Sequence, residues 1–429
     1  MRTLLYICEE WPNPYKPTWD FQIQSLRDLG LDVFVVQCGD YLSKQYEQWG
    51  EKGESLAAVP RFSYPSTLRD IPKHLRNGAF VWRLFARLGY LPCILGQSKP
   101  IKERLLDYLR LCALPKLQYD YVLVKNLNCA ADYSWLPTVV RTQAMPSVYY
   151  HGGAVVGVDS WYLRHRQSFF GNFGAFLTNT RYSKSELEGL GCLSSKIHVV
   201  PVGLKMDLPS PTRTEYRRAG ILRIFSACRL SEEKGVIYAI QAIESLVESG
   251  VTNIKYDIVG NGLEEARLRE YVRKHNLGQW IELHGRKPNT EINERFLTHA
   301  DVFLNTSYPT ESWAENQCIA IQEAGLARVP AIASNCGGLP EVVVDGETGL
   351  LVEVKSLASI AAAIKSMAEM SPAEIARMGL AAEQFARRNF EVATVTKKLV
   401  ELMRGGDMPL VPDNSTGMRD DASVSLTSR

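Results

Sequence analysis

Short apolar runs alternate with amphipathic segments along the first 200 residues. The pattern predicts strands at 3–8, 31–38, 121–124, 148–150, 175–178 and 196–200. Runs of this length, bounded by polar residues, are typical of buried parallel strands. Helices are predicted between them, among them 19–29 and 183–190, with Ser183 and Glu186 as the capping box of the second. Strands that alternate with helices indicate a parallel, doubly wound sheet.

A second series begins after residues 201–220, a stretch rich in Pro, Gly and polar residues that reads as a linker. Strands are predicted at 223–228, 255–259, 280–284, 301–305, 329–333 and 349–352. Helices are predicted at 236–249, 264–275, 291–299 and about 317–324. The chain is therefore predicted to be an α/β protein of two Rossmann-like domains that face a cleft, with bounds near 1–203 and 204–388.

The C-terminal region is helical in pattern over 372–403, with a break at 388–390. We expect the last helix, about 389–404, to cross back onto the first domain. Residues 405–429 lack apolar periodicity and are predicted to be a disordered tail.

Composition excludes few classes of protein but narrows the location. A chain of 429 residues is long enough for two domains, and a net charge of +2 gives no reason to expect a nucleic-acid partner. Nine cysteines without C-x-x-C spacing indicate reduced thiols in a cytoplasmic protein. The N-terminal apolar run is too short for a signal peptide, and none reaches the ~18 residues of a membrane span.

Two glutamates, Glu315 and Glu323, are separated by seven residues where a strand-like run gives way to a helix-like run. On one helix they would lie about 12 Å apart, which suits two ends of one extended ligand. Glu315 precedes the helix, at the sheet edge where open α/β sheets bind ligands. The amides of Asn316, Gln317 and Cys318 would point from the helix start toward a diphosphate. Glu323 lies on an apolar helix and needs a partner such as ribose hydroxyls, unless it is a surface residue.

Two cations, Arg229 and Lys234, flank a loop that opens a helix at Gly235. Arginine can fork onto phosphate oxygens, lysine supplies a compact charge, and the helix start favours anions. Gly235 allows a close backbone approach. Solvated surface charges are the alternative. Cations for phosphates and carboxylates for sugar hydroxyls together indicate a sugar-nucleotide site.

This ordered set, followed by Gly-Gly-Leu-Pro-Glu at 337–341 and Asp-Gly-Glu-Thr-Gly at 345–349, resembles the retaining glycosyltransferases of family four. The similarity is strongest over 197–364. It implies the GT-B fold, with the nucleotide sugar held mainly by the second domain. It also implies that Arg229 and Lys234 hold the diphosphate, Glu323 the ribose and Glu315 the donor sugar. Gly285 and Arg286 match the segment that lines the base pocket.

His151, followed by Gly152, matches the histidine that this family places at the cleft edge of the first domain. The implied role is a hydrogen bond to the donor sugar or the acceptor; a structural histidine is the alternative. One departure concerns Asn316, because the family commonly has glycine after the first glutamate. It leaves open how this loop holds the donor sugar and which sugar fits.

No Asp-x-Asp or clustered His/Cys motif predicts a metal site, and no cofactor is expected beside the nucleotide sugar. The leaving diphosphate would then be neutralised by Arg229, Lys234 and the helix N-terminus. Retention is implied by the resemblance. Since no residue is identifiable as a nucleophile, front-face displacement is favoured over a covalent intermediate.

The sequence therefore predicts transfer of a hexose-type sugar to a glycan or lipid-linked acceptor, in polysaccharide biosynthesis. A nucleotide-sugar epimerase, a glycan phosphorylase and a non-catalytic nucleotide-sugar-binding protein are alternatives. A nicotinamide-dependent dehydrogenase is disfavoured because no G-x-G-x-x-G follows an early strand.

Residues 69–116 carry ten Lys/Arg and three acids among aromatic and aliphatic residues. Such a basic amphipathic stretch can lie on an anionic bilayer, which would place the protein at the inner membrane face. A helical hairpin with a solvated basic face is the alternative.

Overall fold

The computed structural model describes residues 2–8, 18–38, 61–64, 71–96, 99–152, 166–205, 216, 220–288, 291–292, 297–311 and 313–405. Residues 293–296 of the predicted helix at 291–299 and the predicted tail beyond residue 405 lie outside these residues.

The first domain is built on a parallel sheet of seven strands in the order β3-β2-β1-β4-β5-β6-β7. The strands are β1 (Arg2–Cys8), β2 (Leu31–Cys38), β3 (Arg61–Tyr64), β4 (Tyr121–Val124), β5 (Ser147–Tyr150), β6 (Ala175–Thr178) and β7 (Ile197–Val199). Six of them confirm the predicted strands. The sequence pattern missed β3, a four-residue edge strand flanked by prolines, because prolines beside so short a run favour a loop.

The central strand β1 is buried on both faces. Leu5 and Ile7 belong to one apolar cluster, and Leu4 and Tyr6 belong to the cluster on the opposite face. Alternation of side chains along a strand, with helices on both sides, explains why β1 reads as a continuous apolar run.

Helices flank this sheet. They are α1 (Thr18–Asp28), α3 (Ile71–His74), α4 (Gly78–Ala86), α5 (Leu91–Leu95), α6 (Ile101–Ala113), α7 (Leu127–Asp132), α8 (Leu136–Val139), α10 (Arg166–Asn172) and α11 (Arg181–Gly189), with 3-10 turns at Leu88–Tyr90 and Ser194–Lys196. The predicted capping box of α11 is wrong. Thr180 is the N-cap and Ser183 its partner, because the Thr180 hydroxyl accepts from the Ser183 amide and starts the helix earlier than the pattern suggested.

The second domain is built on a parallel sheet of six strands in the order β10-β9-β8-β11-β12-β13. The strands are β8 (Leu222–Ala227), β9 (Ile254–Val259), β10 (Ile281–Leu283), β11 (Val302–Asn305), β12 (Ala331–Ser334) and β13 (Gly349–Val352). Its helices are α12 (Val236–Glu248), α13 (Glu265–Lys274), α15 (Ile319–Leu326), α16 (Leu357–Glu369) and α17 (Pro372–Phe390), with 3-10 turns η6 (Glu232–Lys234), η7 (Leu277–Gln279) and η9 (Leu339–Glu341). Two Rossmann-like units confirm the predicted fold class, whereas the exact boundary at residue 203 stays a prediction.

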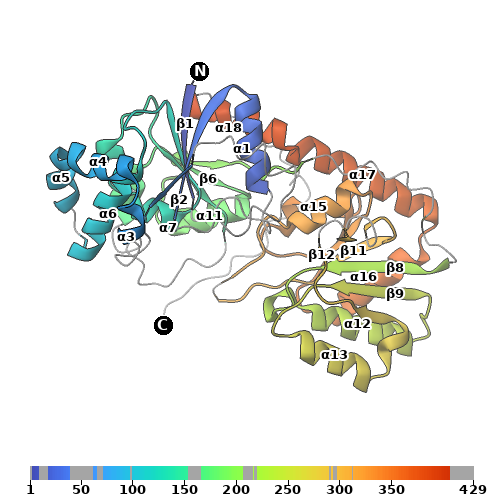
Figure 1. Cartoon of the computed structure of the whole chain (residues 1–429). Helices are drawn as coiled ribbons and strands as arrows, with labels where there is room; N and C mark the ends of the chain where they lie inside the picture. The colour runs from blue at the N-terminus through green and yellow to red at the C-terminus, as the bar shows by residue number, and fades with distance from the viewer. Residues whose placement is uncertain are drawn as a thin grey trace.

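The C-terminal helix returns to the first domain, as predicted. The predicted break at 388–390 is displaced: α17 continues through Phe390, and the break falls at Glu391, the extended N-cap of α18 (Val392–Met403). Val395 and Leu399 of α18 join the apolar cluster of β1 and α1, so the last helix completes the core of the first sheet. In Figure 1, α17 runs along the second domain and α18 lies beside α1.

The basic segment is a set of helices, α3 to α6, at the outer end of the first domain (Figure 1). Several of its cations bind inside the fold, whereas Arg76 and Lys102 are exposed. Arg83 and Arg87 donate to the carbonyls of Cys112 and Leu111. Lys99 is paired with buried Asp107. These three cations bind helix carbonyls and a buried carboxylate, so they are less available to a membrane surface than the sequence suggested; the membrane contact itself stays a prediction.

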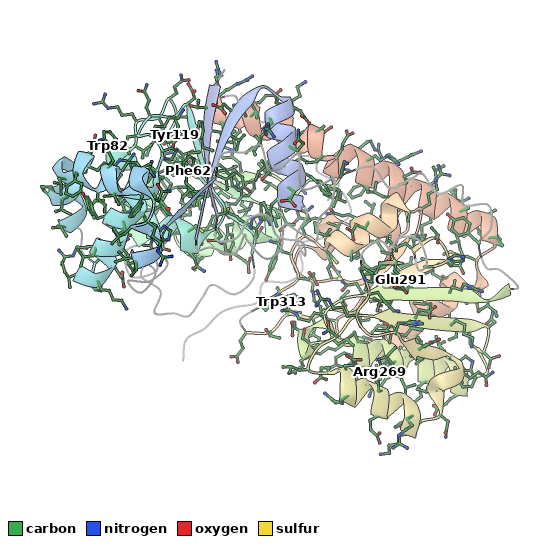
Figure 2. All side chains as sticks on the ribbon, in the orientation of Figure 1. Phe62, Trp82, Tyr119, Arg269, Glu291 and Trp313 are labelled. Carbon is green, nitrogen blue, oxygen red and sulfur yellow. The ribbon has the colours of Figure 1, made fainter. Side chains whose placement is uncertain are left out.

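These helices also expose large apolar side chains. Trp82 and Phe85 are each 70% exposed, and Leu88 is 53% exposed; Figure 2 shows Trp82 at the outer edge of the molecule. No single helix within the described ranges is long and apolar enough to cross a membrane, although the bent pair Gly78–Ala86 and Leu88–Leu95 passes that test when taken together.

Candidate active site

Three of the predicted donor residues, Arg229, Lys234 and Glu315, lie on loops at the carboxyl ends of the second sheet. The loop after β8 carries Arg229 and Lys234, and it rests on the turn after β9. The Leu230 amide donates to the Asn261 carbonyl at 2.9 Å. A Cβ on Gly262 would lie 2.2 Å from the Leu230 oxygen, so only glycine fits there. The sheet edge therefore holds the cation loop in a fixed position, as expected of an open α/β sheet.

Lys234 and Glu315 form a buried ion pair. Their side chains are 14% and 11% exposed, and the Ser307 hydroxyl donates to the same carboxylate oxygen at 3.0 Å. The Lys234 ammonium also lies 4.6 Å from the centre of the Trp313 ring, which Figure 2 shows on the side of the second domain toward the first. The sequence assigned these two residues to different parts of one ligand, and the structure brings them together.

The charge of Glu315 controls the protonation of Lys234. Burial, the largest single influence, lowers the pKa of Lys234, but the charge of Glu315, followed by the Cys318 thiol and the hydrogen bond to Glu315, raises it above its usual value overall. Lys234 is therefore a cation near neutral pH, as the neutralisation of a diphosphate requires.

Two glycines make this arrangement possible. Gly235 has φ 62°, and a Cβ there would lie 2.2 Å from the carbonyl oxygen of Thr306. Gly337 has φ 55°, and its Cβ would lie 2.1 Å from the carbonyl oxygen of Glu315. Both positions combine left-handed backbone with close approach of a neighbouring loop, so the helix start at 235 and the Gly-Gly segment lock the ion pair in place.

Arg229 does not join the buried pair. Its side chain is 65% exposed and its guanidinium lies 3.5 Å from the Glu233 carboxylate. It lies on the same loop as Lys234, at the rim of the site, and its contact with a diphosphate stays a prediction.

Glu323 lies on α15 and carries a perturbed carboxyl group. Burial raises its pKa from 4.5 to about 7, and it accepts no hydrogen bond from any residue within the described part of the chain. A carboxylate in such surroundings gains most from hydroxyl donors supplied by a ligand. The position on an apolar helix confirms the sequence expectation; the ribose as partner stays a prediction.

Asn316 and Gln317, which precede α15, direct their side chains away from the predicted diphosphate site. Asn316 contacts the first domain: its amide nitrogen donates to the His151 carbonyl, and its oxygen accepts from the Thr180 hydroxyl. Gln317 pairs with both main-chain groups of Val202, at 2.6 and 2.9 Å. Cys318 is the N-cap of α15. The predicted diphosphate contacts of their amides stay predictions, whereas the asparagine that departs from the family pattern joins the two domains.

His151 lies at the end of β5, at the edge of the first domain. Its Nδ1 is 2.8 Å from the Asn179 side-chain oxygen. Its ring stacks on Tyr149, with centroids 5.2 Å apart, and meets the edge of Trp19 at 4.6 Å. The ring is held in one orientation beside the loop of Glu315, as a residue that aligns a substrate requires.

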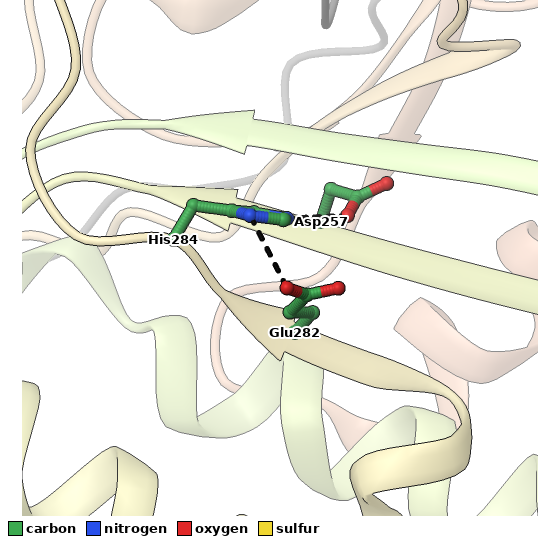
Figure 3. Close-up of side chains that lie close together, drawn as sticks. All are labelled: Asp257, Glu282 and His284. Atoms are coloured by element: carbon green, nitrogen blue, oxygen red, sulfur yellow. Dashed lines mark hydrogen bonds and ion pairs between the residues drawn. The ribbon is translucent and has the colours of Figure 1, made fainter.

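The predicted base-pocket segment follows β10. Gly285 has φ 68°, and its carbonyl accepts from the Gly260 amide at 2.9 Å. The preceding His284 places one ring nitrogen 2.6 Å from Asp257 and the other 3.5 Å from Glu282 (Figure 3). Its ring thus joins β9 to the end of β10 and supports the segment.

These three side chains are also the one group in the described part of the chain whose ligand atoms are close enough for a metal, within 4.8 Å of one another. The sequence did not reveal the group because Asp257 comes from a neighbouring strand. The two carboxylates of the group, however, face different nitrogens of the His284 ring. That arrangement suits a cross-link between strands better than shared ligation of one cation. These three side chains also line a cavity of about 310 Å³. Arg223, another residue of that cavity, lies at the start of β8, whereas the ion pair lies beyond the end of β8.

The sequence missed several supporting residues. Ser307 and Trp313 contact the ion pair, and Glu341 binds main-chain amides of the first domain. Only Glu341 stood in a recognisable motif, Gly-Gly-Leu-Pro-Glu, and there the signal gave no contact partner.

Comparison with known families addresses the second domain. Residues 219–385 match the family model described as glycosyl transferases group 1. The second domain is a group 1 glycosyltransferase domain. The matched residues include the ion pair, Glu323 and the Gly-Gly segment, so the family and the site coincide.

Two curated relatives of this chain are named as biosynthesis glycosyltransferases. WcaL of Escherichia coli K12, named a colanic acid biosynthesis glycosyltransferase, is 31% identical over 219 residues, 51% of this chain and 53% of WcaL. The amylovoran biosynthesis glycosyltransferase AmsK of Erwinia amylovora is 29% identical, over 52% of this chain and 54% of AmsK. The chain thus spans about half the length of the curated relatives it matches.

Solved structures share the whole fold. HepE from Anabaena in complex with UDP superposes with a TM-score of 0.68 at 15% identity, over 94% of this chain and 100% of HepE. TarM gives a TM-score of 0.66 at 12% identity, over 94% of this chain and 99% of TarM. At these identities the likeness concerns the fold alone, and it confirms the predicted GT-B fold.

Proposed function

We propose that the protein transfers a sugar from a nucleoside diphosphate donor to a glycan or lipid-linked acceptor during exopolysaccharide synthesis. The observation that carries the proposal is the buried Lys234–Glu315 pair at the carboxyl edge of a group 1 domain. Lys234 would bind the diphosphate and Glu315 the sugar hydroxyls, and the two side chains are close enough to bind one nucleotide sugar together. His151 lies beside them, because its carbonyl accepts a hydrogen bond from Asn316, the residue after Glu315.

The proposed chemistry is retaining and independent of metal. Lys234, with the helix start at Gly235, stabilises the charge that develops on the leaving diphosphate, and Arg229 approaches from the rim. Glu315 accepts hydrogen bonds from the donor sugar. His151, held by Asn179, orients the sugar or the acceptor hydroxyl. Since no nucleophile is identifiable, the acceptor attacks from the face that the diphosphate leaves.

Uridine diphosphate sugars are the first donors to test. HepE has been solved with UDP and with UDP-glucose, and TarM with UDP. A hexose-type sugar is proposed because the resemblance of the sequence to family four implies it; the names of WcaL and AmsK give the polysaccharides, colanic acid and amylovoran, and no donor sugar.

The proposed location is the cytoplasm, with contact to the inner membrane face. The support is the exposed apolar surface of Trp82, Phe85 and Leu88 on the outer helices of the first domain. Contact of this kind depends on apolar burial, because the nearby arginines are engaged with main-chain carbonyls.

The test is incubation of the full chain with a panel of nucleotide sugars, with and without acceptor extract, followed by detection of nucleoside diphosphate. Acceptor-dependent release supports the proposal. Interconversion of the sugar without release identifies an epimerase. Nucleotide binding without either product identifies a non-catalytic binding protein.

A further inference from the structure

Asn316 uses both polar ends of its side chain on the first domain. The residue is 9% exposed. Its amide nitrogen donates to the main-chain oxygen of His151, and its oxygen accepts the Thr180 hydroxyl. Since a buried amide that loses its partners is costly, this side chain favours the arrangement in which the two domains touch.

Glu341 makes a second, separate contact across the same interface. Its two carboxylate oxygens accept the amides of Arg181 and Tyr182, at 2.8 and 2.9 Å. These amides form the first turn of α11, a nine-residue helix of the first domain. A carboxylate at a helix N-terminus meets unsatisfied amides and the positive end of the helix dipole. Here the helix belongs to one domain and the carboxylate to the other.

Glycines allow the two surfaces to approach this closely. A Cβ on Gly152, which has φ 67°, would lie 2.4 Å from the Asn316 amide nitrogen. A Cβ on Gly338 would lie 2.8 Å from the Thr180 methyl carbon. A side chain at either position would separate the loops, so both faces are shaped for contact.

The two connections between the domains lie side by side. The Leu204 amide donates to the Phe390 carbonyl at 2.6 Å, and the Val392 amide donates to the Leu204 carbonyl at 2.9 Å. Paired crossings of this kind form a narrow joint about which two domains can rotate. Side-chain contacts away from the joint then determine whether the cleft is closed.

We propose that Asn316 and Glu341 are positioning residues that latch the second domain onto the first. The latch places the loop of Glu315 against the strand end that carries His151. The claim that these two residues hold the domains together is independent of the reaction. The claim that they affect the rate of sugar transfer rests on the proposed function.

The first test reads the latch without any substrate. In Glu341→Ala, amide hydrogen exchange should accelerate roughly tenfold in peptides that cover Arg181 and Tyr182, because both amides lose a charged acceptor. Glu341→Gln keeps one acceptor oxygen and should give an intermediate rate. Glu347→Ala removes an exposed glutamate of the same domain and should leave these peptides unchanged.

The second test reads the kinetic consequence. Asn316→Ala should lower kcat by roughly tenfold while the donor KM stays within about twofold, since the donor is held mainly by the second domain. The matched control is Asn253→Ala, which changes an exposed asparagine immediately before β9 in the same domain and should leave kcat and the donor KM unchanged.

The outcomes separate the two claims. Faster exchange in Glu341→Ala supports the latch even where no sugar transfer is found, in which case only the proposed function fails. Wild-type exchange in Glu341→Ala and Glu341→Gln overturns the latch, whatever the activity. A rise in donor KM at constant kcat in Asn316→Ala assigns that residue to donor binding and also overturns its role as a positioning residue.

Discussion

Glu323 gives the sharpest quantitative prediction, because its side chain is half-buried and its carboxyl group accepts no hydrogen bond in the described part of the chain. Its pKa of about 7 in the folded protein, against 4.5 in the unfolded chain, means that the folded state binds more protons between these values. Stability should therefore fall as pH rises from 4.5 to 7 and stay low above it. The difference corresponds to about 3 kcal/mol above pH 7.

Glu323→Gln removes this cost while keeping the side-chain volume. The variant should be more stable than wild type by up to about 3 kcal/mol at pH 8, and by less than about 1 kcal/mol at pH 5. Thermal unfolding at both pH values measures the effect, which amounts to several degrees for a domain of this size. Glu347→Gln, an exposed control, should show no difference at either pH.

The same carboxylate should control donor affinity. If it binds ribose hydroxyls in its ionised form, wild-type affinity for a nucleotide sugar should rise roughly tenfold between pH 6 and pH 8, following ionisation near pH 7. Calorimetric titration of a nucleotide sugar in wild type and Glu323→Gln measures this slope. Equal affinity at both pH values in wild type, or the same slope in Glu323→Gln, would refute the reasoning.

Three further predictions concern the ion pair, the glycine beside it and the apolar surface. Lys234→Met should destabilise the protein by about 3–5 kcal/mol, because it leaves the Glu315 charge buried without a partner. The double variant with Glu315→Leu should recover much of that stability but no activity. Denaturant titration measures the stability of each variant, and a turnover assay measures its activity. Gly235→Ala should cost more than about 2 kcal/mol, whereas Gly250→Ala, also left-handed but with no atom within 4 Å of its Cβ, should cost about 1 kcal/mol. Trp82→Ser should weaken co-sedimentation with liposomes, and binding that falls with salt instead would restore an electrostatic mechanism.

The alternation of apolar runs was enough to predict both sheets, because a short continuous apolar run such as 3–8 is typical of a strand that is buried on both faces. The same reasoning located Glu323, since a carboxylate on an apolar helix is conspicuous. It failed for charges whose partners are main-chain groups. Arg83 and Arg87 were interpreted as surface cations, yet both donate to helix carbonyls. A sequence pattern does not predict which main-chain carbonyls come close to a given side chain.

Pairing across long separations was likewise beyond reach. Lys234 and Glu315 were assigned separate roles, since nothing local states that loops 81 residues apart meet at one sheet edge. Glu341 stood in a recognisable motif, but its partner is a helix start 160 residues earlier. Asn316 was identified as a departure from the family pattern, and only the structure showed that its side chain faces the other domain.

The central claim is that sugar transfer takes place at the Lys234–Glu315 pair. The most direct measurement compares nucleoside diphosphate release from a panel of nucleotide sugars by wild type, Lys234→Met and Glu315→Gln, with acceptor extract present and folding checked by thermal unfolding. The account predicts acceptor-dependent release by wild type with at least one donor, and a rate lower by about 10²–10³ in Lys234→Met and in Glu315→Gln. Release at the wild-type rate by a folded Lys234→Met variant would contradict it.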